Sequence, residues 1–223
     1  TCALPICSVS YVKSGGRRVQ QGSNLSGLML DLLRTPISFD NSNGSDDPSD
    51  PSAYLLPDGS QRNYRAGLGY DNPYWTINQN PFHDDVNRMY GYSQLNYVPT
   101  SWLSIFYRIG TDFYSDRRKQ QFAIGSRAFP AGQISEDQHF FRSVNGDLVI
   151  NAEKNLTYYL NASILLGHNF YSQYDQQLYT QGDGLAIPDF YNIANASTYI
   201  SRESHFKKRT AAYYGEQIGR AHV

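Results

Sequence analysis

The chain has 223 residues, a formal net charge of −1 and only 17% charged side chains, so it lacks the basic surface of a nucleic-acid-binding protein. No apolar run approaches the roughly 18 residues of a membrane-spanning helix. With 19 Tyr and 11 Phe, and 18 Gly spread along the chain, the composition favours an all-β protein with aromatic surfaces over a helical enzyme.

The two ends of the chain resemble peptides encoded by a sequencing adapter. TCALPI opens the chain and IGRAHV closes it, and the reverse complement of a DNA that encodes the second peptide can encode the first. We therefore expect residues 1–7 and 218–223 to be artefacts of handling, and residues 8–217 to be an internal part of a longer protein. Cys2 and Cys7 lie in or beside the first adapter peptide, so no disulfide is expected.

The first natural segment predicts the end of a strand followed by one short helix. Residues 8–19 are expected to finish a strand, with Gly15-Gly16 as a turn. Ser23 or Asn24 is the expected N-cap of the helix. Its apolar stripe is Leu25, Leu28, Met29, Leu32 and Leu33. We expect this stripe to pack on a sheet, with a ligand-facing or gating helix as the alternative.

Two later loops are rich in aromatic and amide side chains. The loop at residues 56–82 contains Asn72, Tyr74 and Trp75, and a loop near the end of the chain contains Phe190 and Tyr191. Aromatic rings and amides of this kind stack on and hydrogen-bond to sugars or peptides, so these five residues are the candidate substrate contacts. A loop packed by its own aromatic side chains is an equally good interpretation of the first segment.

The clearest pattern is a predicted β-hairpin at residues 87–114. Its two runs alternate polar and apolar side chains with period two, and each is about as long as the roughly 9 to 11 residues of a membrane-crossing strand. The expected turn is residues 98–101, bracketed by Tyr97 and Trp102, where the aromatic girdle of an outer-membrane barrel would lie.

A second hairpin, at residues 141–171, repeats the pattern with an expected turn at residues 153–155. Residues 115–138, between the hairpins, are expected to form a long polar loop. Short turns at one end and long loops at the other are typical of outer-membrane barrels and uncommon in soluble sandwiches. The predicted fold is therefore all-β, a partial antiparallel transmembrane β-barrel with long extracellular loops and one short loop helix.

The alternation also assigns side chains to two faces of the predicted strands. The apolar set is expected to face lipid: Leu103, Ile105, Tyr107, Ile109, Leu148, Ile150, Leu160 and Ile164. The polar set is expected to line the lumen: Gln94, Asn96, Arg108, Asp112 and Asn145. A soluble antiparallel sheet with one wet face would alternate in the same way.

No pattern for catalysis or cofactor binding is present in the sequence. The histidines are scattered without metal-ligand spacing, and no nucleophile elbow, phosphate loop or dinucleotide fingerprint occurs. We therefore expect no enzyme activity, no catalytic or metal-binding residue and no cofactor.

Four blocks resemble one family in their order and spacing. They are GSNLSGLMLDLLRTP, YDNPYWTINQNPFHDDVNR, WLSIFYRIGTDFYSDRR and IPDFYNIANAS. Together they resemble the barrel portion of SusC/RagA-type TonB-dependent transporters of the bacterial outer membrane. The resemblance implies a barrel of about 22 strands with a plugged lumen. It also implies uptake of oligosaccharides or peptides, driven through TonB with a SusD-like surface lipoprotein as partner. The family's plug and TonB-contacting segment have no counterpart in these residues.

Two other functions remain open at this point. A secreted soluble β-protein could bind carbohydrate through its aromatic loops without transport. A small closed barrel would need about eight strands, and the sequence predicts only five or six.

Overall fold

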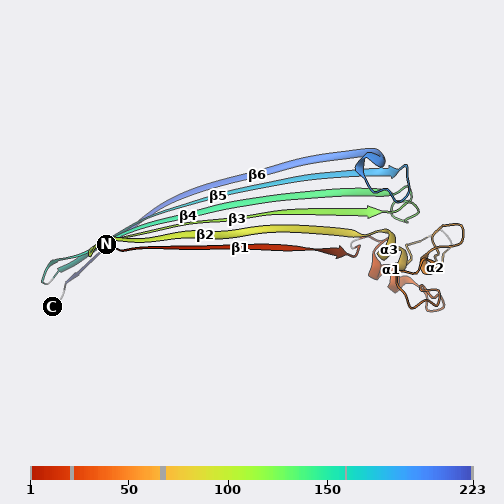
Figure 1. Ribbon diagram of the computed structural model, residues 1–223, viewed down its shortest axis with the longest axis horizontal. Helices are drawn as coiled ribbons and strands as arrows, with labels where there is room; N and C mark the ends of the chain where they lie inside the picture. Colours follow the sequence, from red (N-terminus) through yellow and green to blue (C-terminus); the bar gives the residue numbers. More distant parts are fainter. Residues whose placement is uncertain (1, 21–22, 66–68, 159, 222–223) are drawn as a thin grey trace.

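The computed structural model describes residues 2–20, 23–65, 69–158 and 160–221, and its main feature is one antiparallel sheet (Figure 1). The six strands pair in chain order, β1 with β2 through to β5 with β6. Their bounds are β1 Cys2–Arg18, β2 Phe82–Thr100, β3 Leu103–Phe122, β4 Gln133–Thr157, β5 Leu160–Leu185 and β6 Ala196–Ala221. The sheet is open, because β1 and β6 each pair with one neighbour. The predicted all-β antiparallel fold is confirmed.

The short connections lie at one end of the sheet, a few residues later than predicted. Residues 98–100 belong to β2, and the turn is at Ser101 and Trp102. Residues 153–155 belong to β4, which continues to Thr157. Both strand ends contain a register irregularity, between Tyr97 and Thr100 and between Asn155 and Thr157. Such bulges let a strand continue past residues that favour a turn.

The strands extend well beyond the apolar alternation at the other end of the sheet. Most of residues 115–138, predicted as a loop, belong to β3 and β4, and only residues 123–132 connect the two strands. The prediction was wrong because both faces are polar here, so the period-two signal is lost although the strands still pair. Gly15 and Gly16 are also in a strand and not in a turn. A Cβ at Gly15 would lie 2.8 Å from the Asp84 carbonyl oxygen, so glycine permits this close approach of β1 to β2.

The long connections contain short helices and lie at the end of the sheet opposite the turns (Figure 1). Three α-helices lie between β1 and β2: α1 Leu28–Arg34, α2 Pro51–Tyr54 and α3 Pro73–Gln79. A 3-10 helix, η1 Ile193–Asn195, lies between β5 and β6. One helix was predicted, and the two further α-helices each begin with an Asx cap followed by Pro. No described helix is long and apolar enough to cross a membrane.

Helix α1 differs from its prediction at its start and in its packing. It begins after Gly27, which makes no side-chain cap, while the Ser23 hydroxyl accepts bonds from backbone amides one turn earlier. Met29 and Leu33 of the apolar stripe are 62% and 77% exposed, whereas the single acidic residue of the helix, Asp31, is buried. The expected packing of the stripe on a sheet is therefore wrong.

The end segments predicted to derive from an adapter extend the two edge strands. Residues 2–7 pair with β2, and residues 218–221 pair with β5. Regular antiparallel pairing needs only backbone groups, so it adds these segments to the sheet whatever their side chains.

Candidate functional site

The strand register separates the sheet into two faces with opposite chemistry. Successive rows of side chains across the strands belong to alternate faces of the sheet. Ile105 lies between Tyr97 and Ile150 in one row, and Phe106 lies between Asn96 and Val149 in the next. We call one face the apolar face, and it carries all eight residues expected to contact lipid. We call the other the polar face, and it carries all five residues expected to line the lumen. No described helix covers the apolar face, because the helices lie beyond the loop end of the strands (Figure 1).

The apolar face is continuous over a height that suits a bilayer. On β3 its side chains run from Leu103 to Phe113, which are ten residue steps apart along the strand. At about 3.4 Å per residue and a tilt of about 35 to 45°, this length corresponds to roughly 24 to 28 Å along a membrane normal. The apolar band of an outer-membrane barrel is about 25 Å tall.

Aromatic side chains gather at both rims of this band. Trp102, at the turn end, is 44% exposed and follows Tyr97 by five positions. At the loop end, Phe113 of β3 lies one row below Phe140, whose ring centroid is 6.3 Å from that of Tyr174. Phe and Tyr rings at these heights match the two aromatic girdles of membrane barrels.

The polar face carries ion pairs between neighbouring strands and along them. The four Arg-Asp pairs are Arg18–Asp84 at 2.8 Å, Arg88–Asp112 at 2.6 Å, Arg108–Asp147 at 3.2 Å and Arg118–Asp116 at 2.6 Å. Two of the expected lumen residues, Arg108 and Asp112, are members of these pairs, and Asn145 donates to Asp147 at 3.3 Å. Gln94 lies opposite Arg108, and Asn96 lies one row nearer the turns. The polar face is thus hydrophilic, and over β1–β4 its arginines are each neutralised by an aspartate.

The loop end is held together by a small aromatic core. Trp75, Tyr54, Ala53 and Ala123 form a buried cluster, with Tyr74 and Tyr191 packed against it. The Trp75 indole donates to the Ser126 hydroxyl at 2.9 Å. The structure therefore brings together three of the predicted substrate contacts, Tyr74, Trp75 and Tyr191, as packing partners.

The five predicted substrate contacts differ strongly in their exposure. Asn72 is 1% exposed and caps α3, accepting from the Tyr74 amide and donating to the carbonyls of Ala53 and Arg62. Trp75 is 4% exposed, Tyr74 and Tyr191 are half-buried, and Phe190 is 50% exposed. Burial raises the pKa of Tyr191 to about 12, with Asp189 adding to the rise. Phe190 is the member of this set whose ring is open to a ligand.

Two buried acidic residues that the sequence did not predict lie at the loop end, Asp31 in α1 and Asp71 just before α3. Asp71 is fully buried and accepts from Gln61 and from the Arg127 amide, both at 2.8 Å. Asp31 is also fully buried, and neither of its carboxylate oxygens has a hydrogen-bond partner among the described residues. Burial raises the pKa of Asp31 to about 8, with the charge of Asp71 adding to the rise and Arg34 opposing it. Asp31 lies among the leucines of α1 but is not part of the apolar stripe, so the spacing of the apolar residues did not predict its burial.

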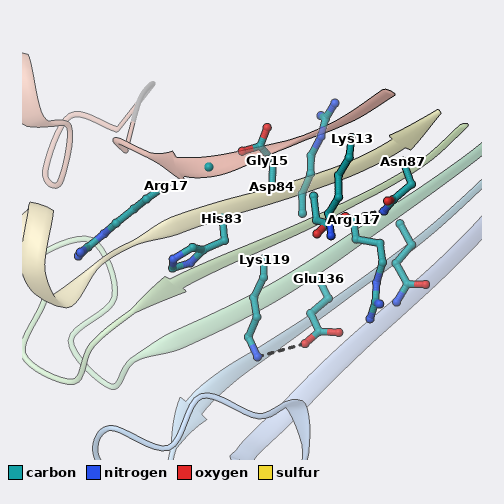
Figure 2. Close-up of a pocket in the computed structure, with 13 residues that line it drawn as sticks. Lys13, Gly15, Arg17, His83, Asp84, Asn87, Arg117, Lys119 and Glu136 are labelled. Carbon is teal, nitrogen blue, oxygen red and sulfur yellow. Dashed lines mark hydrogen bonds and ion pairs between the residues drawn. The ribbon is translucent and has the colours of Figure 1, made fainter. Parts of the chain in front are cut away.

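A charged groove of about 900 Å³ lies between the apolar band and the loop helices (Figure 2). It is lined by Lys13, Arg17, Arg117, Lys119 and Glu136, among others. Lys119 contacts Glu136 at 3.4 Å and donates to the Tyr191 carbonyl at 2.8 Å. The sequence did not predict this groove, because five of its thirteen lining residues lie in the segment 115–138 that was expected to be a loop. Within the described residues, no three acidic, histidine or cysteine side chains gather closely enough to hold a metal ion.

Comparisons with known proteins give similarity in structure but not in sequence. No protein-family model matches the chain, and no curated protein matches it. The structure is similar to the RagAB peptide importer in its closed-closed state, with a TM-score of 0.63 and 13% identity over 96% of this chain. It is similar to the open-open state with a TM-score of 0.61 and 13% identity over 94%. A further structure of the RagAB peptide transporter gives 0.59 and 11% over 73%.

The chain spans about a quarter or less of these transporters, covering 24%, 23% and 19% of their lengths. At this level of identity the similarity shows a related fold. These structural neighbours are transporters and not enzymes.

Proposed function

We propose that this chain is part of the wall of an outer-membrane β-barrel that takes up oligosaccharides or peptides. The observation that carries the proposal is the apolar face, which is about as tall as the hydrocarbon core, has aromatic rims and is covered by no described element. A soluble sheet would need a second layer over such a face. The fold shared with the RagAB transporter supports the same conclusion.

In this proposal the open sheet is closed by strands of the same longer protein. Unpaired edge strands such as β1 and β6 cannot face lipid, because their backbone groups would have no partners there. Residues 8–217 would then be an internal part of the barrel, and residues 1–7 and 218–223 would derive from the sequencing adapter. The apolar face meets lipid, and the polar face lines the lumen.

The energy source and partner follow from the family resemblance. TonB would couple uptake to the inner-membrane proton gradient, and a SusD-like lipoprotein would cover the barrel at its loop end. Among the five candidate contacts, Phe190 has the exposed ring that stacking on a sugar or peptide requires.

The test begins with recovery of the full-length reading frame from the source DNA by long-read sequencing. Fluorescent peptides and oligosaccharides are then offered to cells with the gene intact, with the gene deleted, and with TonB removed. We expect uptake of one ligand class to be lost in both deletions. Uptake that survives both deletions would contradict the proposal. A reading frame that begins near residue 8 and ends near residue 217 would favour the secreted binding protein.

A single substitution tests the ligand contact within the same assay. Phe190→Ala should reduce uptake, because it removes an exposed ring without disturbing the buried cluster around Trp75. Ile187→Ala, which removes another exposed apolar side chain from the same connection, is the matched control. Equal uptake by both variants would remove Phe190 from the site.

A further inference from the structure

The apolar face becomes cationic on the loop side of its aromatic rim. In the rows between Phe113 and the loops, this face carries Arg117 and Lys119 on β3. The same rows place Lys13 and Arg17 on β1, and Arg142 of β4 lies opposite Phe113 itself. The acidic residues of β1–β4 on these rows are Asp85 and Glu136. Cations therefore outnumber anions on this part of the face.

The cations of the two faces differ in their partners. On the polar face of β1–β4, the four arginines Arg18, Arg88, Arg108 and Arg118 are each paired with an aspartate. On the other face, the exposed side chains of Lys13, Arg117 and Arg142 have no acidic group within 4 Å in the described part of the chain. Lys119, with Glu136 at 3.4 Å, is the exception there. Within β1–β4, the unneutralised charge thus lies on the face that carries the apolar band.

The height of these cations is that of a lipid headgroup. Arg117 follows Phe113 by four residues, which is about 14 Å along the strand and roughly 10 Å along the membrane normal. Lys and Arg side chains can extend back along apolar surface towards the interface. The groove is bounded on its loop side, where Arg17 donates to the Asn78 carbonyl and Lys119 to the Tyr191 carbonyl. Figure 2 shows Arg117, Lys119 and Glu136 on one side of the sheet and Asp84 on the other.

We propose that this groove binds the phosphate groups of an anionic glycolipid of the outer leaflet, of the diphosphoryl lipid A kind. The inference rests on the proposed function, since it takes the apolar face to meet lipid. A lipid whose acyl chains lie against Ile109 and Phe113 places its headgroup beside Arg117 and Lys13. Guanidinium and ammonium groups without acidic partners are the usual ligands of phosphate. A ligand inside the lumen would meet the neutralised polar face instead.

The test uses the full-length protein in detergent, with lipid binding followed by native mass spectrometry. The probes are diphosphoryl lipid A, its fully dephosphorylated form and inorganic phosphate. We expect the wild type to bind the diphosphoryl lipid at least about tenfold more tightly than the dephosphorylated lipid. Equal binding would overturn the proposal without any variant. Displacement of bound lipid A by millimolar inorganic phosphate would overturn the lipid as the ligand and assign the groove to a free anion.

The charge variants locate the site. The double variant Lys13→Gln and Arg117→Gln should weaken binding of diphosphoryl lipid A by about 10- to 30-fold, because each cation near a membrane surface strengthens binding by about three- to fivefold. Lys154→Gln is the control, because Lys154 is an exposed cation on the same face at the turn end of β4. If Lys154→Gln weakened lipid binding as much as the double variant does, the assignment of the site to the groove would be refuted. Uptake is measured in parallel, so that lipid binding without uptake contradicts the proposed function alone, and uptake without lipid binding contradicts this inference alone.

Discussion

Leu148 and Val149 are adjacent residues of β4 that give the sharpest test of the two faces. Leu148 lies opposite Tyr107 on the apolar face, close to the middle of the band from Leu103 to Phe113. Val149 lies opposite Phe106 on the polar face, and both side chains are half-buried. A lysine on the lipid side near the midplane of a barrel costs about 2 to 4 kcal/mol. A lysine on the lumen side remains in water, so we expect a cost below about 1 kcal/mol.

The measurement is the free energy of unfolding of the full-length protein in lipid bilayers, obtained from urea titrations of the two variants. Leu148→Lys should destabilise the protein by about 3 kcal/mol, which is roughly a hundredfold in the unfolding equilibrium. Val149→Lys should leave the midpoint almost unchanged. Equal costs, or a larger cost at Val149, would refute the assignment of the faces.

Two further predictions concern the loops and the packing of the sheet. The pKa of Asp31, raised to about 8, means that the folded state holds a proton that the unfolded state releases near pH 4, so the loop end should lose stability as pH rises from about 4 to 8. Asp31→Asn should reduce this slope in thermal melts and be the more stable protein at pH 8; burial also raises the pKa of Asp71, so part of the slope remains. Asp71→Asn should destabilise the protein, because it disturbs hydrogen bonds at a buried site. An unchanged slope in Asp31→Asn would contradict the burial of Asp31. Gly146→Ala should destabilise by about 1 to 3 kcal/mol, because its Cβ would lie 2.0 Å from the Phe170 ring. Gly16→Ala, with no atom closer than 3.9 Å, is the control in the same urea titration, and a cost shared by both variants would point to a backbone effect.

The sheet was predictable wherever one face is apolar and the other polar. From Leu103 to Phe113 the alternation of apolar and polar side chains predicted the strand, the side chains that share a face and the partner strand. The same strand continues to Phe122 through residues that are polar on both faces, and there the sequence carries no periodic signal. Pairing with neighbouring strands, which the sequence of one strand does not reveal, keeps these residues extended.

The loop end was less predictable because its side chains are buried against each other. Trp75 and Phe190 are both aromatic residues in loops, and composition alone treats them alike. The structure separates them, since Trp75 packs on Tyr54 with ring centroids 6.3 Å apart while Phe190 is open. Burial of Asp31 was equally hidden, because it depends on α1 turning its leucines outward.

The most direct test of the central claim is a scan of accessibility along β3. Single cysteines at residues 103–113 of the full-length protein, with Cys2 and Cys7 replaced by serine if present, are spin-labelled in lipid bilayers. Collision rates with oxygen and with a water-soluble nickel complex are then compared. A membrane-barrel wall predicts that odd-numbered positions favour oxygen and even-numbered positions favour nickel, in strict alternation. Equal access of nickel to both sets, or the opposite alternation, would contradict the placement of this sheet in a membrane.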